Sequence, residues 1–97
     1  MRKGYWITIY RGVSDPGRLT QYAALAGPAI EAGGGRILAR GVAAATLEGG
    51  QNQRTVVIEF DSVTQAMATY HGPAYQAAVA VLGGAADREV RIVEGVA

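Results

Sequence analysis

The segment YWITIYR, residues 5–11, places large apolar side chains on both faces of one predicted strand. Successive side chains of a strand point to opposite faces, so the odd positions carry tyrosine and isoleucine and the even positions tryptophan, threonine and tyrosine. A strand with two apolar faces needs a covering layer on each side. The rest of the chain must therefore supply two layers.

Three further segments are predicted to be strands: residues 36–49, 54–60 and 88–95. The first two flank a polar turn at 49–53 and are expected to form a hairpin. Gly41 lies inside the first of them and indicates a bulge or a close backbone approach. The last segment alternates Val90 and Ile92 with Arg91 and Val93, a pattern that predicts the final strand.

The first helix is predicted to begin at Pro16, because a serine and an aspartate just before it can cap it and proline is favoured at the first helical position. Its apolar stripe consists of Leu19, Tyr22, Ala23, Ala26 and Ile30. Pro28 is expected to kink or interrupt the helix near Gly27. The three glycines at 33–35 are expected to end it.

The second helix opens with the capping-box sequence SVTQ, in which Ser62 and Gln65 are expected to satisfy each other's backbone N–H groups. Its pattern breaks at Gly72-Pro73, inside the stretch YHGPAY. A further helical segment then continues to the glycines that follow Leu82.

The predicted order is β-α-β-β-α-β in one domain spanning residues 1–97. We therefore expect an α+β, ferredoxin-like fold, in which a four-stranded antiparallel sheet carries its helices on one face. The other face also needs cover, and the simplest cover is the sheet of a second copy. The sequence thus predicts a homodimer. Its 49% hydrophobic and 18% charged residues agree with self-association.

Composition excludes several classes of function. The chain has no cysteine and one histidine, so neither a thiolate site nor a built-in metal site is expected. The nine basic residues are spread along the chain and the net charge is +1, so no nucleic-acid partner is expected. No segment has the pattern of a signal peptide or a membrane span. We expect a cytoplasmic protein without a cofactor.

Nearly the whole chain resembles a known family through an ordered set of stretches: KGYWI (3–7), the Asp15-Pro16 helix start, GGGRILARG (33–41), VVIEFDS (56–62), AMATYHGPAYQAA (66–78), GAAD (84–87) and RIVEG (91–95). The family is the bacterial domain of unknown function 1330, part of the dimeric α+β-barrel group. The resemblance implies that fold and a homodimer. The wider group includes cofactor-free monooxygenases of aromatic polyketides, isomerases and cyclases, and proteins that only bind a ligand.

The chain departs from this family at two places. Where members often read S-P-E-Y after the helix break, it has Gly72-Pro73-Ala74-Tyr75. Where many place an arginine late in the following helix, it has Leu82. Roles that a serine, glutamate or arginine has there in relatives are therefore not carried over.

His71 is the predicted acid/base residue. Imidazole titrates near neutral pH, so one positioned histidine can move a proton without a cofactor. Its place at the helix break would direct it toward a cavity between helix and sheet. The alternative is a surface or capping histidine that only hydrogen-bonds a backbone carbonyl.

Aromatic side chains are the predicted walls of a ligand pocket: Tyr5, Tyr22, Tyr70 and Tyr75. A cavity lined by rings and a few hydroxyl groups suits an aromatic or polyketide-like ligand. The alternative for most of them is packing in the core or in the dimer interface.

Arg40 and Glu59 lie in adjacent predicted strands that are otherwise largely apolar. A charge in a covered strand must be paired or must contact a ligand. The two could form a cross-strand ion pair. Alternatively, Arg40 holds a ligand oxyanion through its planar guanidinium group and Glu59 also lies at the ligand.

Two functions fit these residues. In the first, a homodimer binds an aromatic or polyketide-like small molecule and acts as a cofactor-independent isomerase, cyclase or monooxygenase, with His71 as the base and Arg40 as the oxyanion partner. In the second, the same fold is a non-catalytic ligand-binding or interaction module. An enclosed cavity with the His71 ring inside it would favour the first.

Overall fold

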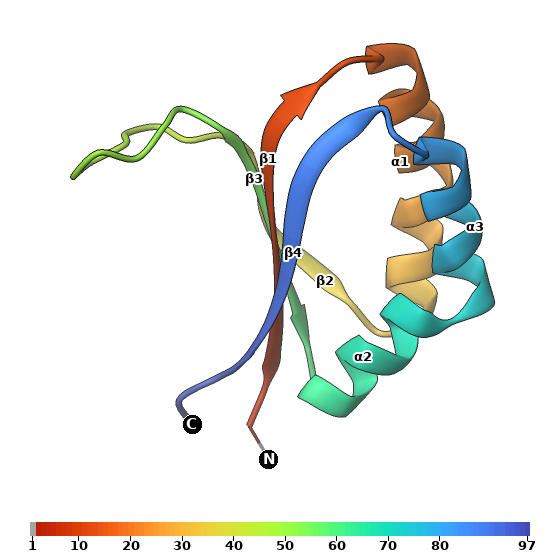
Figure 1. The fold of residues 1–97 in the computed structure, drawn as a ribbon. Helices are drawn as coiled ribbons and strands as arrows, with labels where there is room; N and C mark the ends of the chain where they lie inside the picture. The colour runs from red at the N-terminus through yellow and green to blue at the C-terminus, as the bar shows by residue number, and fades with distance from the viewer. Residues whose placement is uncertain (1) are drawn as a thin grey trace.

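A computed structural model describes residues 2–97. Its elements, in chain order, are β1 (Gly4–Val13), α1 (Pro16–Ala32), β2 (Arg36–Val42), β3 (Arg54–Phe60), α2 (Val63–His71), α3 (Pro73–Leu82) and β4 (Ala86–Glu94). The four strands form one antiparallel sheet in the order β2-β3-β1-β4. All three helices lie on one face of this sheet (Figure 1). The predicted ferredoxin-like fold is confirmed.

The starts of α1 and α2 are capped at predicted residues. The Asp15 side chain accepts a hydrogen bond from the Arg18 backbone N–H at 3.2 Å, and Ser62 accepts one from the Gln65 N–H at 3.1 Å. The reciprocal half of the predicted capping box is absent. The Gln65 side chain instead donates to the Gly33 carbonyl at 2.7 Å and so connects the end of α1 to α2.

The expected interruption of the first helix at Pro28 is wrong, because α1 continues through it to Ala32. A proline inside a helix removes one hydrogen bond and crowds the carbonyl four residues earlier. Here Pro28 and Ala24 are both exposed, so water can bind that carbonyl. The helix ends at the predicted glycines, where Gly34 takes a φ of +90°.

The YHGPAY stretch is a helix break, as predicted. α2 ends at His71 and α3 begins at Pro73, while Gly72 between them has extended backbone angles. The Gly72 carbonyl accepts the N–H of Gln76 in the first turn of α3. The two short helices can therefore pack in different directions over the sheet (Figure 1).

The hairpin formed by β2 and β3 differs from expectation in two details. β2 ends at Val42, and residues 43–53 form a loop that projects from the sheet away from the helices (Figure 1). The irregularity lies between Ile37 and Ala39, not at Gly41. A Cβ atom on Gly41 would meet no atom within 4 Å, so no close approach requires this glycine.

The core lies between the helices and the even-numbered face of β1. The Trp6 ring is 1% exposed, stacks on Phe60 with ring centroids 6.0 Å apart, and meets the edge of Tyr75 at 4.7 Å. Phe60 and Tyr75 are fully buried. Within residues 2–97, no helix combines the length and hydrophobicity needed to cross a membrane.

Candidate functional site

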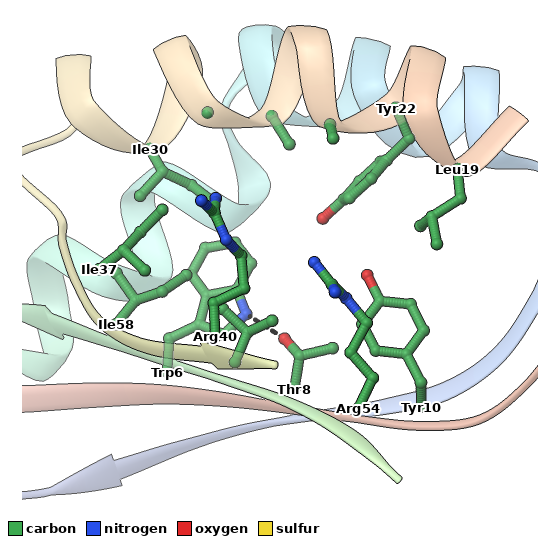
Figure 2. Close-up of a pocket in the computed structure, with 14 residues that line it drawn as sticks. Trp6, Thr8, Tyr10, Leu19, Tyr22, Ile30, Ile37, Arg40, Arg54 and Ile58 are labelled. Carbon is green, nitrogen blue, oxygen red and sulfur yellow. Dashed lines mark hydrogen bonds between the residues drawn. The ribbon is translucent and has the colours of Figure 1, made fainter. Parts of the chain in front are cut away.

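A pocket of about 90 Å³ lies between α1 and the helix-facing side of the sheet (Figure 2). The even positions of β1 form its floor, because they point toward the helices: Trp6, Thr8 and Tyr10. Tyr22, on the buried face of α1, lies across the pocket from them. The remaining apolar walls come from both layers and include Leu19, Ala26, Ile30, Ile37, Val56 and Ile58.

Two arginines from the hairpin also line this pocket. Arg40 of β2 lies opposite Val56, and Arg54 begins β3, so both side chains point to the helix-facing side. Figure 2 shows the Arg54 side chain extending toward the hydroxyl groups of Tyr10 and Tyr22. Its guanidinium carbon lies 6.0 Å from the centroid of the Tyr10 ring.

A third arginine lies behind the tyrosines that line the pocket. Arg88 of β4 donates hydrogen bonds to the Tyr22 hydroxyl at 2.9 Å, to the Tyr75 hydroxyl at 3.0 Å and, at 3.4 Å, to the Tyr10 hydroxyl. Burial by itself lowers the pKa of this guanidinium, but the tyrosine oxygens around it outweigh burial and the pKa is raised. Arg88 is therefore a half-buried cation held by three tyrosine hydroxyl groups.

The pKa values of the Tyr10 and Tyr75 hydroxyl groups, which both contact Arg88, are raised, so these two groups stay protonated at neutral pH. Burial is the largest cause that raises the pKa of Tyr75, and the neighbouring Tyr22 raises it further. Burial also raises the pKa of Tyr10. The Tyr22 and Tyr75 oxygens lie 2.6 Å apart, so one of these hydroxyl groups donates to the other.

Cations without an acidic partner gather at this pocket. Five of the nine basic residues form salt bridges to carboxylates within residues 2–97. The four that do not are Arg18, Arg40, Arg54 and Arg88, and the last three lie at or directly behind the pocket. The pocket is therefore the place in the described chain where positive charge is least compensated.

The structure brings three of the predicted site residues together. Arg40 and Tyr22 line the pocket, and Tyr75 lies behind Tyr22 as its hydrogen-bond partner. Tyr70 is outside it: its ring packs against Trp6 at 5.4 Å between centroids and belongs to the core.

Tyr5 and Glu59 lie on the opposite face of the sheet, and the predicted Arg40–Glu59 ion pair is wrong. Glu59 accepts hydrogen bonds from Tyr5 at 3.0 Å and from Arg36 at 3.1 Å. Both bonds lower the pKa of Glu59, and the bond from Tyr5 has the larger effect. The hairpin register places Arg36 opposite Glu59 and Arg40 opposite Val56. Val56 and Glu59 are three positions apart on β3 and therefore point to opposite faces of the sheet. Arg40, opposite Val56, does not meet Glu59.

His71 lies at the exposed end of α2, where its ring meets the edge of the Tyr70 ring at 5.1 Å. It is not among the residues that line the pocket. The structure therefore does not bring His71 and Arg40, the two predicted catalytic residues, into one site. An acid/base role for His71 stays a prediction.

Sequence reasoning missed several residues of this site, chiefly Tyr10, Arg54 and Arg88. A signal was present for Arg88, because it has the same strand parity as Val90 and Ile92 and so points into the core. Tyr10 likewise shares its parity with buried Trp6. Within residues 2–97, no three histidine, aspartate or glutamate side chains lie close enough to hold a metal ion.

Solved structures with similar folds come from several bacteria. The methylated RPA0582 protein, from Rhodopseudomonas palustris, is 18% identical with a TM-score of 0.76, over 99% of this chain and 82% of that one. A dimeric ferredoxin-like protein of unknown function from Thermobifida fusca is 20% identical with a TM-score of 0.66, over 96% and 91%. A proposed antibiotic biosynthesis monooxygenase from Caulobacter crescentus is 13% identical with a TM-score of 0.60, over 99% and 91%.

At these identities the structural likenesses show the fold alone. A comparison with the curated proteins finds no match. The model of the family described as domain of unknown function (DUF1330), in contrast, matches residues 3–96, almost the whole chain. The protein therefore belongs to the DUF1330 family.

Proposed function

We propose that this protein is a homodimeric small-molecule-binding protein whose site is the pocket between α1 and the sheet. Its ligand is a small organic molecule with a negatively charged oxygen. The observation that carries the proposal is the polar lining of the pocket, which consists of hydrogen-bond donors and hydroxyl groups: Trp6, Thr8, Tyr10, Tyr22, Arg40 and Arg54. No carboxylate or amide side chain is among the described lining residues.

The size of the cavity limits how much of the ligand it encloses. Its volume of about 90 Å³ is below the roughly 150 Å³ of a cavity that holds benzene in another protein. It therefore suits a charged head group with a few carbons, while the rest of the ligand lies along the rim. Exposed Arg40 and Ile37 form part of that rim.

Removal of one guanidinium group tests the site. We expect Arg54→Met to weaken the binding of benzoate about tenfold or more, because a hydrogen bond to a charged group contributes about 1.5–3 kcal/mol. Arg40→Met should have a smaller, few-fold effect because Arg40 is exposed and water screens its charge. Isothermal titration calorimetry measures both affinities.

Arg18→Met is the matched control, because Arg18 also forms no salt bridge within residues 2–97 and does not line the pocket. Benzoate affinity should stay unchanged in this variant. Equal benzoate affinities for the wild-type protein, Arg54→Met and Arg18→Met would contradict the proposed site. So would a wild-type protein that binds neither benzoate nor propionate, a smaller carboxylate used as a second probe.

The dimer is supported by the side of the sheet that faces away from the helices. Apolar side chains occupy its centre, with Ile7 of β1 opposite Val57 of β3. Ion pairs surround this centre: Arg36 with Glu59 at one end, Arg11 with Asp87 at the other, and Arg91 with Glu89 along the edge strand β4. An apolar centre with a polar rim is typical of protein interfaces. The Thermobifida fusca neighbour is itself described as dimeric.

A cofactor-independent isomerase, cyclase or monooxygenase acting on an aromatic or polyketide-like molecule is the second candidate. It is favoured by the aromatic pocket floor and by the fold shared with the Caulobacter crescentus protein. In this candidate too, the proposed site is the pocket with its arginines.

The His71→Ala variant tests whether His71 contributes to the ligand site. Since His71 is exposed and outside the pocket, we expect unchanged benzoate affinity and an unchanged melting temperature. Calorimetry and thermal denaturation measure the two. A tenfold loss of affinity in a folded His71→Ala variant would instead place His71 at the ligand and contradict this assignment of the site.

A further inference from the structure

Counting donors leaves two arrangements for the hydroxyl hydrogen atoms of the buried Tyr22 and Tyr75. Arg88 donates to both the Tyr22 and the Tyr75 oxygen, and these oxygens lie 2.6 Å apart. Each phenol has one hydrogen, so one hydroxyl group donates to the other. The hydrogen of the accepting hydroxyl group then has no acceptor among the side chains of residues 2–97.

Tyr22 is the hydroxyl group positioned to donate into the pocket. Tyr22 lines the cavity, whereas Tyr75 is fully buried, is not a lining residue and lies behind Tyr22. If Tyr75 donates to Tyr22, the Tyr22 hydrogen is directed to a group inside the cavity. This arrangement satisfies both hydroxyl groups as soon as the pocket holds an acceptor.

Two further hydroxyl groups of the pocket, those of Thr8 and Tyr10, also have a hydrogen that no side chain of residues 2–97 accepts. Thr8 accepts the indole N–H of Trp6 at 3.0 Å, and Tyr10 accepts a hydrogen bond from Arg88. Each oxygen therefore accepts one hydrogen bond, and neither group has an acceptor for its own hydrogen among the hydrogen bonds of the described side chains. Together with Tyr22, these groups can donate three hydrogen bonds to a ligand, beside the charges of the arginines.

A ligand O–H group finds few acceptors in such a pocket, because the guanidinium groups only donate and each of the three hydroxyl groups already accepts at least one hydrogen bond. A neutral enol or phenol can donate only to a hydroxyl oxygen that already accepts a hydrogen bond, and it gains no net charge attraction from the guanidinium groups. The corresponding oxyanion accepts from the hydroxyl groups and is attracted by three guanidinium groups. The pocket therefore discriminates between the two protonation states of one ligand.

We propose that the pocket binds a conjugated weak oxygen acid, an enol or a phenol, as its anion and so lowers the pKa of the ligand. This inference rests on the proposed function, that the pocket binds small organic anions. On binding, the ligand O–H bond breaks, the electron pair stays on the oxygen and the proton goes to water at the open rim. The flat rings of Trp6 and Tyr22 suit a conjugated anion better than an aliphatic one.

A chromogenic phenol tests the proposal directly, because the 4-nitrophenolate anion absorbs visible light and the neutral phenol does not. We expect bound 4-nitrophenol to titrate at least about one pH unit below the unbound probe, which corresponds to a tenfold or greater preference for the anion. The readout is the absorbance of the probe at saturating protein over a pH series. A bound probe that titrates at or above the pH of the unbound one would overturn the proposal.

Two variants separate the hydroxyl groups from the fold. Tyr22→Phe and Tyr10→Phe each remove one donor with little change of shape, and each should reduce the pKa shift of the bound probe. Thermal denaturation shows whether each variant is folded. Arg18→Met is again the control and should leave the shift as in the wild type. An unchanged shift in both folded tyrosine variants would contradict the role of these hydroxyl groups.

The probes also separate the two proposals. Benzoate carries its charge already, so it reports on anion binding alone, and 4-nitroanisole has the ring of the phenol without an ionisable oxygen. We expect 4-nitroanisole to bind at least about tenfold more weakly than 4-nitrophenolate. Benzoate binding with an unshifted 4-nitrophenol overturns only the present inference. Failure of benzoate, propionate and 4-nitrophenol to bind overturns the proposed function as well.

Discussion

Replacing Trp6 by alanine is expected to lower the free energy of unfolding by about 3–5 kcal/mol, as truncation of a buried aromatic residue does. The Trp6 ring is 1% exposed and contacts three other aromatic rings of the core. In a domain of this size the loss corresponds to a fall in melting temperature of roughly 12 °C or more. Thermal denaturation followed by circular dichroism measures it.

The matched control is Leu25→Ala, since Leu25 is 45% exposed on the solvent side of α1. We expect this change to cost less than about 1 kcal/mol. All three proteins must be compared at one protein concentration, because association stabilises a folded state by mass action. Similar melting temperatures for Trp6→Ala and Leu25→Ala would show that the core does not centre on Trp6.

Local patterns predicted most of the fold because each has a short-range physical cause. The cap at Asp15 and the break at Gly72-Pro73 depend on residues within one helical turn, and both occur where they were predicted. The even face of β1 is buried under the helices because its alternation has a period of two. These features do not depend on how distant segments pair.

The errors concern features that distant contacts decide. The pairing of Arg40 with Glu59 required a hairpin register that places the two residues opposite each other, whereas the observed register places Arg36 opposite Glu59. The extra residue between Ile37 and Ala39 turns Arg40 to the other face. The continuity of α1 through Pro28 depends on which side of the helix faces the core. Neither the register nor the orientation is encoded in the residues next to these positions.

The site was only half predictable for a related reason. The stripe of the first helix identified Tyr22 as a core-facing residue, but the partner of its hydroxyl group comes from β4 at the other end of the chain. Arg88 occupies the same face of β4 as Ile92, which suggests that it points toward the core. Arginines are usually exposed, however, so this position alone does not predict a core-facing side chain. Only the assembled sheet shows that three tyrosines, and no carboxylate of the described chain, surround Arg88.

The uncovered face of the sheet leads to the second large expected effect. Ile7 lies on the central strand β1, between Val57 of β3 and Arg91 of β4. If two sheets pack face to face, an Ile7→Lys substitution buries an unpaired ammonium group in the middle of the interface, which costs several kcal/mol. The dimer should then dissociate.

Light scattering coupled to size-exclusion chromatography measures this dissociation. We expect the wild-type protein at micromolar concentration to have twice the mass of the 10.1 kDa chain, and Ile7→Lys to elute with the mass of one chain. Leu25→Lys adds the same charge on the helix face and should leave the mass unchanged, since only the sheet face is expected to associate. A wild-type protein with the mass of one chain would contradict the predicted dimer, because the apolar outer face of β1 would then be exposed to water. A dimer that dissociates in Leu25→Lys and not in Ile7→Lys would place the interface on the helices instead.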